Sequence, residues 1–281
     1  MSTTTLDPVS LAPDPAPAPA GGRLRWAIAD ARTLTWRNLL RYVRIPDSLF
    51  FSTVQPIMFV LLFRFVFGGA INIPGVPYVD YLIAGIYVQT VMFGTVSTSV
   101  GLAEDLHLGL IERFRALPMA RSAVLAGRTT ADLVRNVGVM FVITAVGYAV
   151  GYRVLTSFFG FVLAFLVVLF FAYAMSWGFA IVGLMASNSE TAQLAAFPVL
   201  FPLTFASSAF VPVTTMPGWL QAFAKHQPVT QVVNASRQLL LGNAPHPGLW
   251  STSAIWQSLA WSVGLLVIFA PLAVWRYRRA A

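Results

Sequence analysis

Long stretches without a charged residue are the feature that most limits how this chain can fold. No Asp, Glu, Lys or Arg occurs in residues 81–103, 154–189, 191–224 or 238–275. A membrane helix needs roughly 17–25 predominantly apolar residues, and every stretch is long enough to supply one. Only 10% of the 281 residues are charged, against about 25% in an average soluble domain. The sequence therefore predicts an all-α integral membrane protein.

Charge and composition exclude several other classes of protein. The net charge of +8 does not indicate nucleic-acid binding, because the Arg residues flank apolar stretches instead of forming one basic and aromatic face. Anionic lipid headgroups account for the charge better. The chain has no cysteine, and His107, His226 and His246 lack the spacing of metal ligands. We therefore expect no metal site and no cofactor bound by this chain.

Two segments precede the first apolar stretch. Residues 1–22 are rich in Pro and Ala and predict a disordered cytoplasmic tail. Residues 23–46 have a helical pattern with Arg37, Arg41 and Arg44 on one face, which predicts an amphipathic helix at the membrane interface. A soluble cytoplasmic helix has the same pattern and stays open as an alternative.

Hydropathy predicts one domain with six transmembrane helices in residues 47–281. They are expected at residues 49–68, 78–100, 137–152, 158–185, 191–211 and 253–275. Pro198 and Pro202 in the fifth predict a kink or a local unwinding. A loop of residues 101–136 follows the second span, and a polar segment of residues 214–250 precedes the last.

The basic residues predict the orientation of the spans. Fourteen of the eighteen Lys and Arg residues lie in residues 23–44, in residues 113–135 or after residue 275. An even number of spans puts these three segments on one side, which the positive-inside rule assigns to the cytoplasm. We therefore expect a multi-pass protein of the plasma (inner) membrane with both termini in the cytoplasm.

No enzyme active site is indicated. A phosphate-binding P-loop needs Gly-Lys-Ser/Thr, and the only lysine, Lys225, follows Ala224. Other catalytic motifs, such as Gly-x-Ser-x-Gly and His-Glu-x-x-His, do not occur. Asp80 and Glu190 lie at predicted span ends, which disfavours a proton relay inside the membrane.

Two ordered motifs lie outside the predicted spans. Residues 109–118 read Gly-Leu-Ile-Glu-Arg-Phe-Arg-Ala-Leu-Pro and are followed by Gly127-Arg128 and Asp132. Residues 226–230 read His-Gln-Pro-Val-Thr and are followed by Arg237 and Gly242. From residue 23 onward the chain resembles the ABC type-2 permease family, in its daunorubicin/doxorubicin-resistance branch of drug exporters. In that family, the segment that corresponds to residues 109–132 reads Gly-x-x-Glu-Arg-Phe/Leu-Arg-x-x-Pro followed by Gly-Arg-x-x-x-Asp. The segment that corresponds to residues 226–242 begins Asn-Pro-Leu/Ile-Thr. This chain has Gln227 in place of that Asn.

The resemblance implies a transport subunit without its own ATPase site. It implies two permease subunits, identical or homologous, joined to two copies of a separate ABC ATPase subunit that carries ATP and Mg. A cytoplasmic helix would dock on that ATPase through Glu104, Glu112, Arg113, Phe114, Arg115 and Leu117. Phe114 and Leu117 would provide the buried anchor of the interface. The alternative is a loop whose charges only stay solvated and set the topology.

Residues 214–250 are too polar and too rich in Pro for two more spans. We expect a short re-entrant extracellular hairpin of two helices, one around Trp219 and the other over residues 229–241, ended by Gly242. The resemblance implies an extracellular gate formed by Trp219, Phe223, Gln227, Pro228 and Arg237. A passive interfacial hairpin with aromatic anchors is the alternative.

The substrate path is expected where two permease subunits meet. Its candidate lining is Thr90, Phe93, Ser97, Phe201, Thr204 and Ser208. An uncharged, aromatic lining suits a hydrophobic drug-like, lipid or glycolipid substrate. The resemblance implies that ATP drives the export of this substrate by alternating access. Two other classes stay open, namely an ATP-independent secondary transporter or channel and an intramembrane lipid-modifying enzyme.

Overall fold

The computed structural model describes residues 23–44, 46–109, 121–242, 249–250 and 252–279, and these residues form helices, turns and loops without a β-strand. The helices, in chain order, are α1 (Arg23–Arg44), α2 (Pro46–Leu62), the π-helix η2 (Phe63–Phe67), α3 (Tyr78–Gly94), α4 (Val96–His107), α6 (Arg121–Ala149), α7 (Phe158–Met185), α8 (Ser189–Phe205), the 3-10 helix η3 (Val213–Thr215), α9 (Gly218–His226), α10 (Pro228–Leu241) and α11 (Ala254–Arg279).

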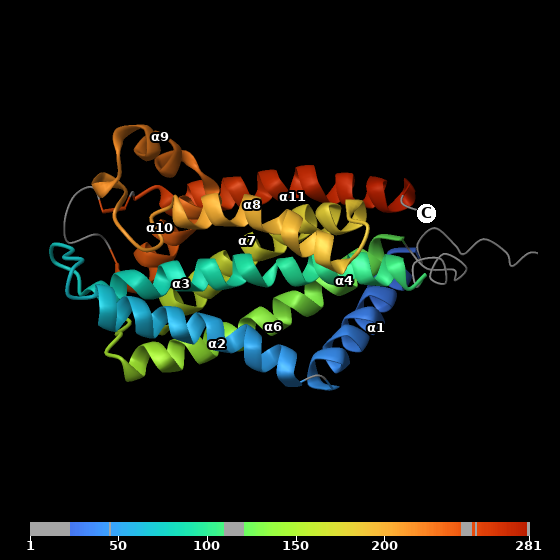
Figure 1. Ribbon diagram of the computed structural model, residues 1–281, viewed down its shortest axis with the longest axis horizontal. Helices are drawn as coiled ribbons and strands as arrows, with labels where there is room; N and C mark the ends of the chain where they lie inside the picture. The colour runs from blue at the N-terminus through green and yellow to red at the C-terminus, as the bar shows by residue number, and fades with distance from the viewer. Residues whose placement is uncertain (1–22, 45, 110–120, 243–248, 251, 280–281) are drawn as a thin grey trace, which may run out of the picture.

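The long helices run along the long axis of the molecule (Figure 1). One end holds α1, the end of α4 and the end of α11, and the opposite end holds α9 and α10. Two of the basic segments, α1 and the last turn of α11 with Arg276, Arg278 and Arg279, therefore lie at the same end. This agrees with an even number of crossings, while the side of the membrane on which that end lies stays a prediction.

Four helices in the described part of the chain are long and apolar enough to cross a membrane. They are Tyr78–His107, Ser122–Ala149, Phe158–Met185 and Ala254–Arg279, and a shorter apolar helix covers Ser52–Phe67. α8 has 17 residues, about 25 Å at 1.5 Å per residue, less than the roughly 30 Å of a hydrocarbon core. The chain is thus a multi-pass membrane protein, and the count of six spans stays a prediction.

The helices extend further into the loop of residues 101–136 than hydropathy predicted. α4 continues to His107, and α6 begins at Arg121 instead of near residue 137. Hydropathy marks where apolar residues end, whereas a helix continues through polar residues when it keeps packing partners. The start of α6 has such a partner in α1, which packs along it.

Local signals account for several helix ends. The side chain of Ser157 accepts a hydrogen bond from the backbone N–H of Gly160 at the start of α7, and Asn188 does the same for Thr191 at the start of α8. α10 begins with Pro228 and ends at Gly242, whose φ of 81° suits glycine. The two expected helices of residues 214–250 are therefore present, and their re-entry into the membrane stays a prediction.

α8 is a continuous helix through Pro198 and Pro202. The predicted local unwinding is not found at these prolines, and instead the helix ends at Phe205, before the expected residue 211. A non-helical segment, residues 206–210, follows and packs against α3 and α10.

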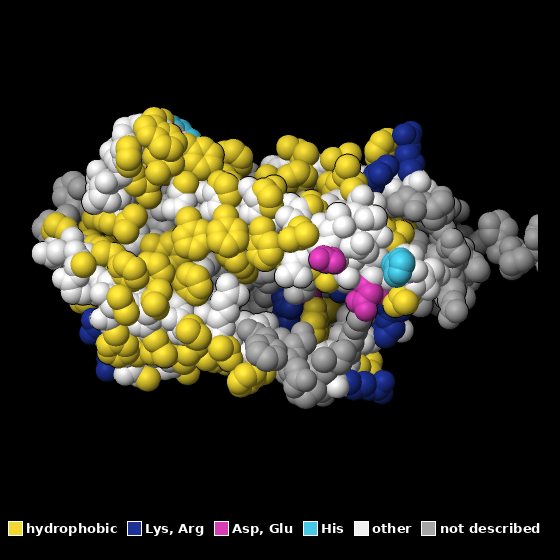
Figure 2. Space-filling view, in the orientation of Figure 1, with side chains coloured by type: hydrophobic (Ala, Val, Ile, Leu, Met, Phe, Trp, Pro, Cys, Tyr) yellow, Lys and Arg dark blue, Asp and Glu magenta, His cyan; other side chains and the backbone are white. Residues whose placement is uncertain are grey.

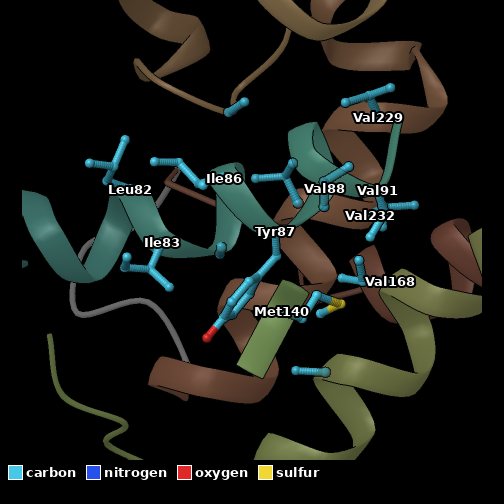
Figure 3. Packing of buried hydrophobic residues seen from close by; sticks show 14 of the residues in the cluster. Leu82, Ile83, Ile86, Tyr87, Val88, Val91, Met140, Val168, Val229 and Val232 are labelled. Atoms are coloured by element: carbon cyan, nitrogen blue, oxygen red, sulfur yellow. The ribbon is translucent and has the colours of Figure 1, made fainter. Parts of the chain in front are cut away.

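α3 lies at the centre of the bundle. Its residues Tyr78–Met92 are all buried, as expected for a helix that is apolar on every side. Figure 3 shows its side chains packed against Met140 of α6, Val168 of α7 and Val232 of α10. The Tyr87 hydroxyl, the polar group at the end of a side chain in this view, has a hydrogen-bond partner, because it lies 2.6 Å from the Thr144 hydroxyl.

Gly85 is where α3 comes closest to residues 206–210. A Cβ atom at Gly85 would overlap the backbone carbonyl of Ala209, and small residues permit such close backbone approach in membrane proteins. We expect Gly85→Ala to lower the free energy of unfolding by about 1–3 kcal/mol, measured as a lower melting temperature in detergent. Gly138→Ala is the control, because a Cβ there meets nothing within 4 Å and the melting temperature should not fall. Equal melting temperatures for the two variants would contradict this packing.

Hydrophobic side chains cover the middle of the face formed by α8, α3 and α2, and Lys and Arg lie towards the ends (Figure 2). Large exposed residues include Phe65, Phe201, Leu194 and Met58. A contiguous apolar surface of this kind marks contact with a membrane or with another protein.

Candidate transport pathway and its supports

A cavity of about 80 Å³ opens between α2, α3 and α6. Three residues of the predicted substrate path, Thr90, Phe93 and Ser97, line it together. The remaining lining residues are Ser52, Gln55, Pro56, Phe59, Gln89, Gly94, Arg135, Asn136 and Val139. The structure thus brings half of the predicted path residues to one site inside a single subunit, with polar and aromatic groups side by side.

A row of phenylalanine rings leads to this cavity. Successive ring centroids lie 4.5–5.7 Å apart in the order Phe67, Phe63, Phe210, Phe205, Phe201 and Phe93. The row begins in η2, at the end of the molecule that holds α9 and α10, and ends on the cavity wall. Ring contacts at these separations are favourable for flat apolar molecules as well.

The other three predicted path residues are placed differently. Phe201 is exposed on α8 and touches Phe93, with ring centroids 5.7 Å apart. Thr204 and Ser208 are buried, and neither lines the cavity. Ser208 instead binds Arg237, because its hydroxyl lies 3.2 Å from Nη1 and its carbonyl oxygen 2.7 Å from Nη2. The structure therefore joins Ser208 to the predicted gate residues.

Arg237 of α10 is fully buried where α10 meets α3 and residues 206–210. Its Nε donates to the carbonyl oxygen of Tyr81 at 3.0 Å, and its Nη2 also donates to that of Ala209 at 3.1 Å. Its Cζ lies 3.3 Å from the centroid of the Tyr81 ring. The hydrogen-bond partners that the structure describes for Arg237 are all neutral oxygens. Because arginine stays protonated in proteins, this is a buried charge held by dipoles and a ring face.

The remaining gate candidates fall into two groups. Gln227 is buried and donates from Nε2 to the carbonyl oxygen of Ala206 at 2.6 Å, and Pro228 is the first residue of α10. Gln227 and Arg237 together fix α10 to residues 206–210. Trp219 is 76% exposed on α9, and Phe223 is exposed beside it. The structure does not bring these two aromatic residues to the buried group.

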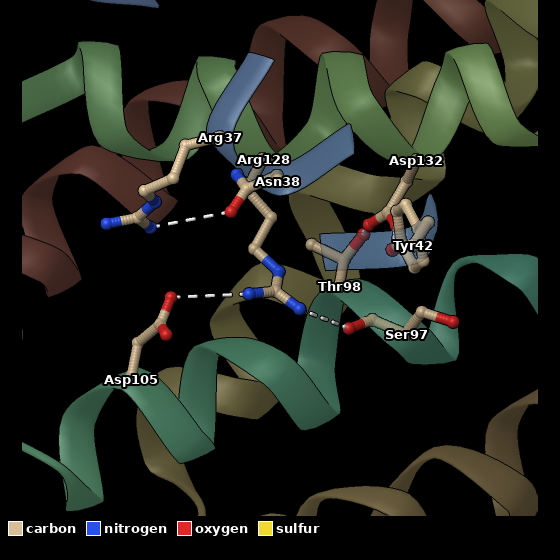
Figure 4. Close-up of polar contacts among 8 residues, drawn as sticks. All are labelled: Arg37, Asn38, Tyr42, Ser97, Thr98, Asp105, Arg128 and Asp132. Atoms are coloured by element: carbon tan, nitrogen blue, oxygen red, sulfur yellow. Dashed lines mark hydrogen bonds and ion pairs between the residues drawn. The ribbon is translucent and has the colours of Figure 1, made fainter. Parts of the chain in front are cut away.

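A polar network ties α1, α4 and α6 together at the other end of the bundle (Figure 4). The Asp132 carboxylate of α6 accepts hydrogen bonds from the hydroxyls of Tyr42 on α1 and Thr98 on α4. Arg135 lies over the Tyr42 ring, 5.2 Å from its centroid, and donates to the Ser97 hydroxyl at 2.6 Å. Burial first, and then the Asp132 charge, raise the pKa of Tyr42 above its ordinary value, so its hydroxyl stays a donor at neutral pH.

The second part of this network is an ion pair. Arg128 lies 3.2 Å from the Asp105 carboxylate of α4 and also donates to the carbonyl oxygen of Ser97 at 3.2 Å. Glu104, predicted to couple to an ATPase, lies in the same last turns of α4 and is partly buried. The other predicted coupling residues, Glu112, Arg113, Phe114, Arg115 and Leu117, lie outside the described residues.

Several residues of these sites were not singled out as site residues from the sequence. The motif Gly127-Arg128-x-x-x-Asp132 contains two of them, and its four-residue spacing places both on one side of α6. Tyr42 and Asp105 carry no comparable signal, because their partners lie 90 and 23 residues away in the chain. Gln89 was not distinguishable from other polar residues in a buried helix.

Comparison with known proteins agrees with this arrangement. The family model described as ABC-2 type transporter matches residues 30–241. The chain is 37% identical over 261 residues to the daunorubicin resistance ABC transporter permease protein DrrB1 of Streptomyces coeruleorubidus, covering 92% of this chain and 90% of that protein. It is 26% identical over 292 residues to the probable doxorubicin resistance ABC transporter permease protein DrrC of Mycobacterium tuberculosis, covering 100% and 99%.

A more distant relative is the putative transport permease ycf38 of Pyropia yezoensis, 26% identical over 222 residues, or 75% of this chain and 74% of that protein. The match of the family model spans α2, α3 and α6, which form the cavity, and it reaches to the end of α10, which carries Arg237. The chain therefore belongs to the ABC-2 type transporter family, among relatives that are drug-resistance permeases.

Proposed function

We propose that this chain is the permease subunit of an ATP-driven exporter that moves hydrophobic drug-like molecules out of the cytoplasm or the inner leaflet. The observation that carries the proposal is the 37% identity, over 92% of the chain, to a permease of daunorubicin resistance. Membership of the ABC-2 family implies a partner ATP-binding subunit, so this chain supplies the pathway. These relatives do not favour the ATP-independent transporter, channel or lipid-modifying enzyme that the sequence left open.

The cavity and the phenylalanine row support an apolar, ring-containing substrate. Phe59 and Phe93 line the same cavity as several polar groups, which suits a molecule with flat apolar rings and polar edges. The volume of about 80 Å³ is well below the roughly 300–1,000 Å³ of a drug-sized site. The structure then corresponds to a closed state of the path, which a second state must widen during alternating access.

Coupling to ATP is assigned to the end that carries α1 and α4. Residues 104–117, including Glu104, dock on the ATPase in this proposal, and Phe114 and Leu117 anchor the contact. The Asp132 network then passes movement of α4 to α1 and α6, because one carboxylate holds a hydroxyl from each. Two permease copies and two ATPase copies, with ATP and Mg on the ATPase, complete the exporter in the plasma membrane, with both termini in the cytoplasm.

The opposite end is assigned to the extracellular gate. Arg237 binds α10 to α3, and Gln227, which precedes Pro228 at the start of α10, binds Ala206. Trp219 and Phe223 on α9 present an exposed aromatic surface. In this arrangement α9 is the part that contacts lipid or a second subunit, and α10 is the part that stays fixed.

Uptake into inside-out membrane vesicles tests the function. Vesicles contain this chain together with its partner ATPase, and daunorubicin uptake is measured with ATP, with ADP, and with ATP plus an ionophore that collapses ion gradients. We expect uptake that requires ATP and persists with the ionophore. Uptake that is lost with the ionophore, or that persists with ADP in place of ATP, would contradict an ATP-driven exporter.

A further inference from the structure

Two polar side chains of α3 face the cavity without a protein partner. Gln89 is 3% exposed and Thr90 is 8% exposed. Among the described residues, nothing hydrogen-bonds the Gln89 Oε1 atom or the Thr90 hydroxyl. Both side chains line the cavity between α2, α3 and α6. Buried polar atoms without partners are uncommon, because burial without a hydrogen bond is costly.

Three threonine hydroxyls nearby have protein partners, whereas the buried Ser99 hydroxyl of α4 has none among the described residues. The hydroxyl of Thr95 donates to the carbonyl oxygen of Met92 at 2.6 Å, and that of Thr144 donates to the carbonyl oxygen of Met140 at 2.7 Å. The Thr98 hydroxyl binds Asp132. Thr90 thus differs from these three threonines, whose hydroxyls all reach protein acceptors, and its own hydroxyl belongs to a side chain that lines the cavity.

The cavity offers a defined set of hydrogen-bonding groups. Gln89 supplies a carbonyl oxygen, and Thr90 supplies a hydroxyl that donates and accepts. Arg135 lines the same cavity with its Nε unpartnered among the described residues, while its Nη atoms bind Ser97 and the carbonyl oxygen of Gly94 at 2.6 and 2.8 Å. A donor and an acceptor beside a fixed positive charge suit a neutral hydroxyl or carbonyl group and disfavour a cation.

The size of the cavity limits what enters it. A water molecule takes about 30 Å³ of liquid volume, so about 80 Å³ accommodates one oxygen-bearing edge of a larger molecule. Phe59 of α2 and Phe93 of α3, which also line the cavity, provide aromatic rings for the apolar part next to that edge.

We propose that this cavity is a specificity subsite, in which Gln89 and Thr90 hydrogen-bond a neutral hydroxyl or carbonyl edge of the exported molecule. The subsite lies within one subunit and does not require residues of a second copy. The inference rests on the proposed export function and names the feature of the substrate that the chain selects.

Two transported probes distinguish the loss of a hydrogen bond to the substrate from a general change in the shape of the cavity. Daunorubicin carries hydroxyl and carbonyl groups, and tetraphenylphosphonium is an apolar cation with no hydrogen-bonding group. Their ATP-driven uptake is measured in vesicles with the wild type, Thr90→Val and Gln89→Leu. Thr129→Val is the matched control, because this buried hydroxyl binds the carbonyl oxygens of Leu125 and Ala126 and does not line the cavity.

We expect Thr90→Val and Gln89→Leu each to raise the KM for daunorubicin roughly three- to tenfold with an unchanged maximal rate, as for loss of one hydrogen bond. The KM for tetraphenylphosphonium, and all values for Thr129→Val, should stay at the wild-type level. An unchanged KM for daunorubicin, or an equal rise for both probes, would overturn the subsite.

Equilibrium binding keeps the subsite testable if uptake fails. The dissociation constant of daunorubicin for the purified chain with its partner is read from the fluorescence of the drug. Wild-type vesicles that take up neither probe would count against the export function. A dissociation constant that rises three- to tenfold in both α3 variants would still support the subsite, and equal constants would overturn it.

Discussion

Replacing Arg237 by methionine is expected to destabilise the protein more than any other single change described here. Methionine fills similar space but leaves the carbonyl oxygens of Ser208 and Ala209 without the donors that now reach them at 2.7 and 3.1 Å. A buried polar group that loses its partner costs about 1–3 kcal/mol, so two such oxygens lower the free energy of unfolding by about 2–6 kcal/mol. In detergent the melting temperature should fall by roughly 10 °C.

Two further variants sharpen this prediction. Arg237→Lys keeps the charge but offers one compact ammonium in place of a planar fork of five donors, so we expect an intermediate melting temperature. Arg153→Met is the control, because Arg153 is exposed and its loss should change the melting temperature little. An Arg237→Met protein with the same melting temperature as the wild type would show that the buried guanidinium does not hold α10 in place.

Replacing Asp132 by leucine is expected to uncouple transport from ATP. The carboxylate is the shared acceptor for Tyr42 and Thr98, so its loss removes one hydrogen bond to α1 and one to α4 at the same time. Coupling between distant sites is typically worth about 1–3 kcal/mol, or 5- to 150-fold, and we expect ATP-driven daunorubicin uptake to fall at least about fivefold. Glu190→Gln, an exposed carboxylate at the start of α8, is the control and should leave uptake unchanged.

A double-mutant cycle attributes the effect of Asp132 to the contact with α1. Tyr42→Phe removes one hydroxyl, and the cycle with Asp132→Leu should give an interaction energy of about 0.5–3 kcal/mol from melting temperatures. Independent, additive effects, or wild-type uptake by Asp132→Leu, would contradict a network that joins the three helices.

The sequence predicted the helices best where a composition boundary and a capping residue coincide. The predicted span of residues 158–185 has the same two ends as α7, and Ser157 caps the start of this helix. Pro228 and Gly242 similarly bound α10 within a residue of the predicted helix. The start of α6 was predicted near residue 137, whereas the helix begins at Arg121. Hydropathy locates the apolar part that crosses the membrane, and residues 121–136 are helical because α1 packs on them.

The candidate site was less predictable than the helices. α3 is apolar on every side, so periodicity does not reveal which face of it meets α2 and α6, and Gln89 carried no signal. Thr90, Phe93 and Ser97 were found because they are small polar or aromatic residues in one predicted span. The contact between Tyr42 and Asp132 joins residues 90 positions apart, and pairing at that separation depends on tertiary packing.

Co-purification from native membranes tests the central claim that this chain works with a separate ATPase. Membranes that hold the wild type or a Glu112→Ala, Phe114→Ala, Arg115→Ala variant are solubilised in mild detergent, and the proteins that purify with each chain are identified. We predict that a P-loop ATPase purifies with the wild type and is lost from the correctly inserted variant. The absence of any ATPase from the wild-type sample would contradict the account.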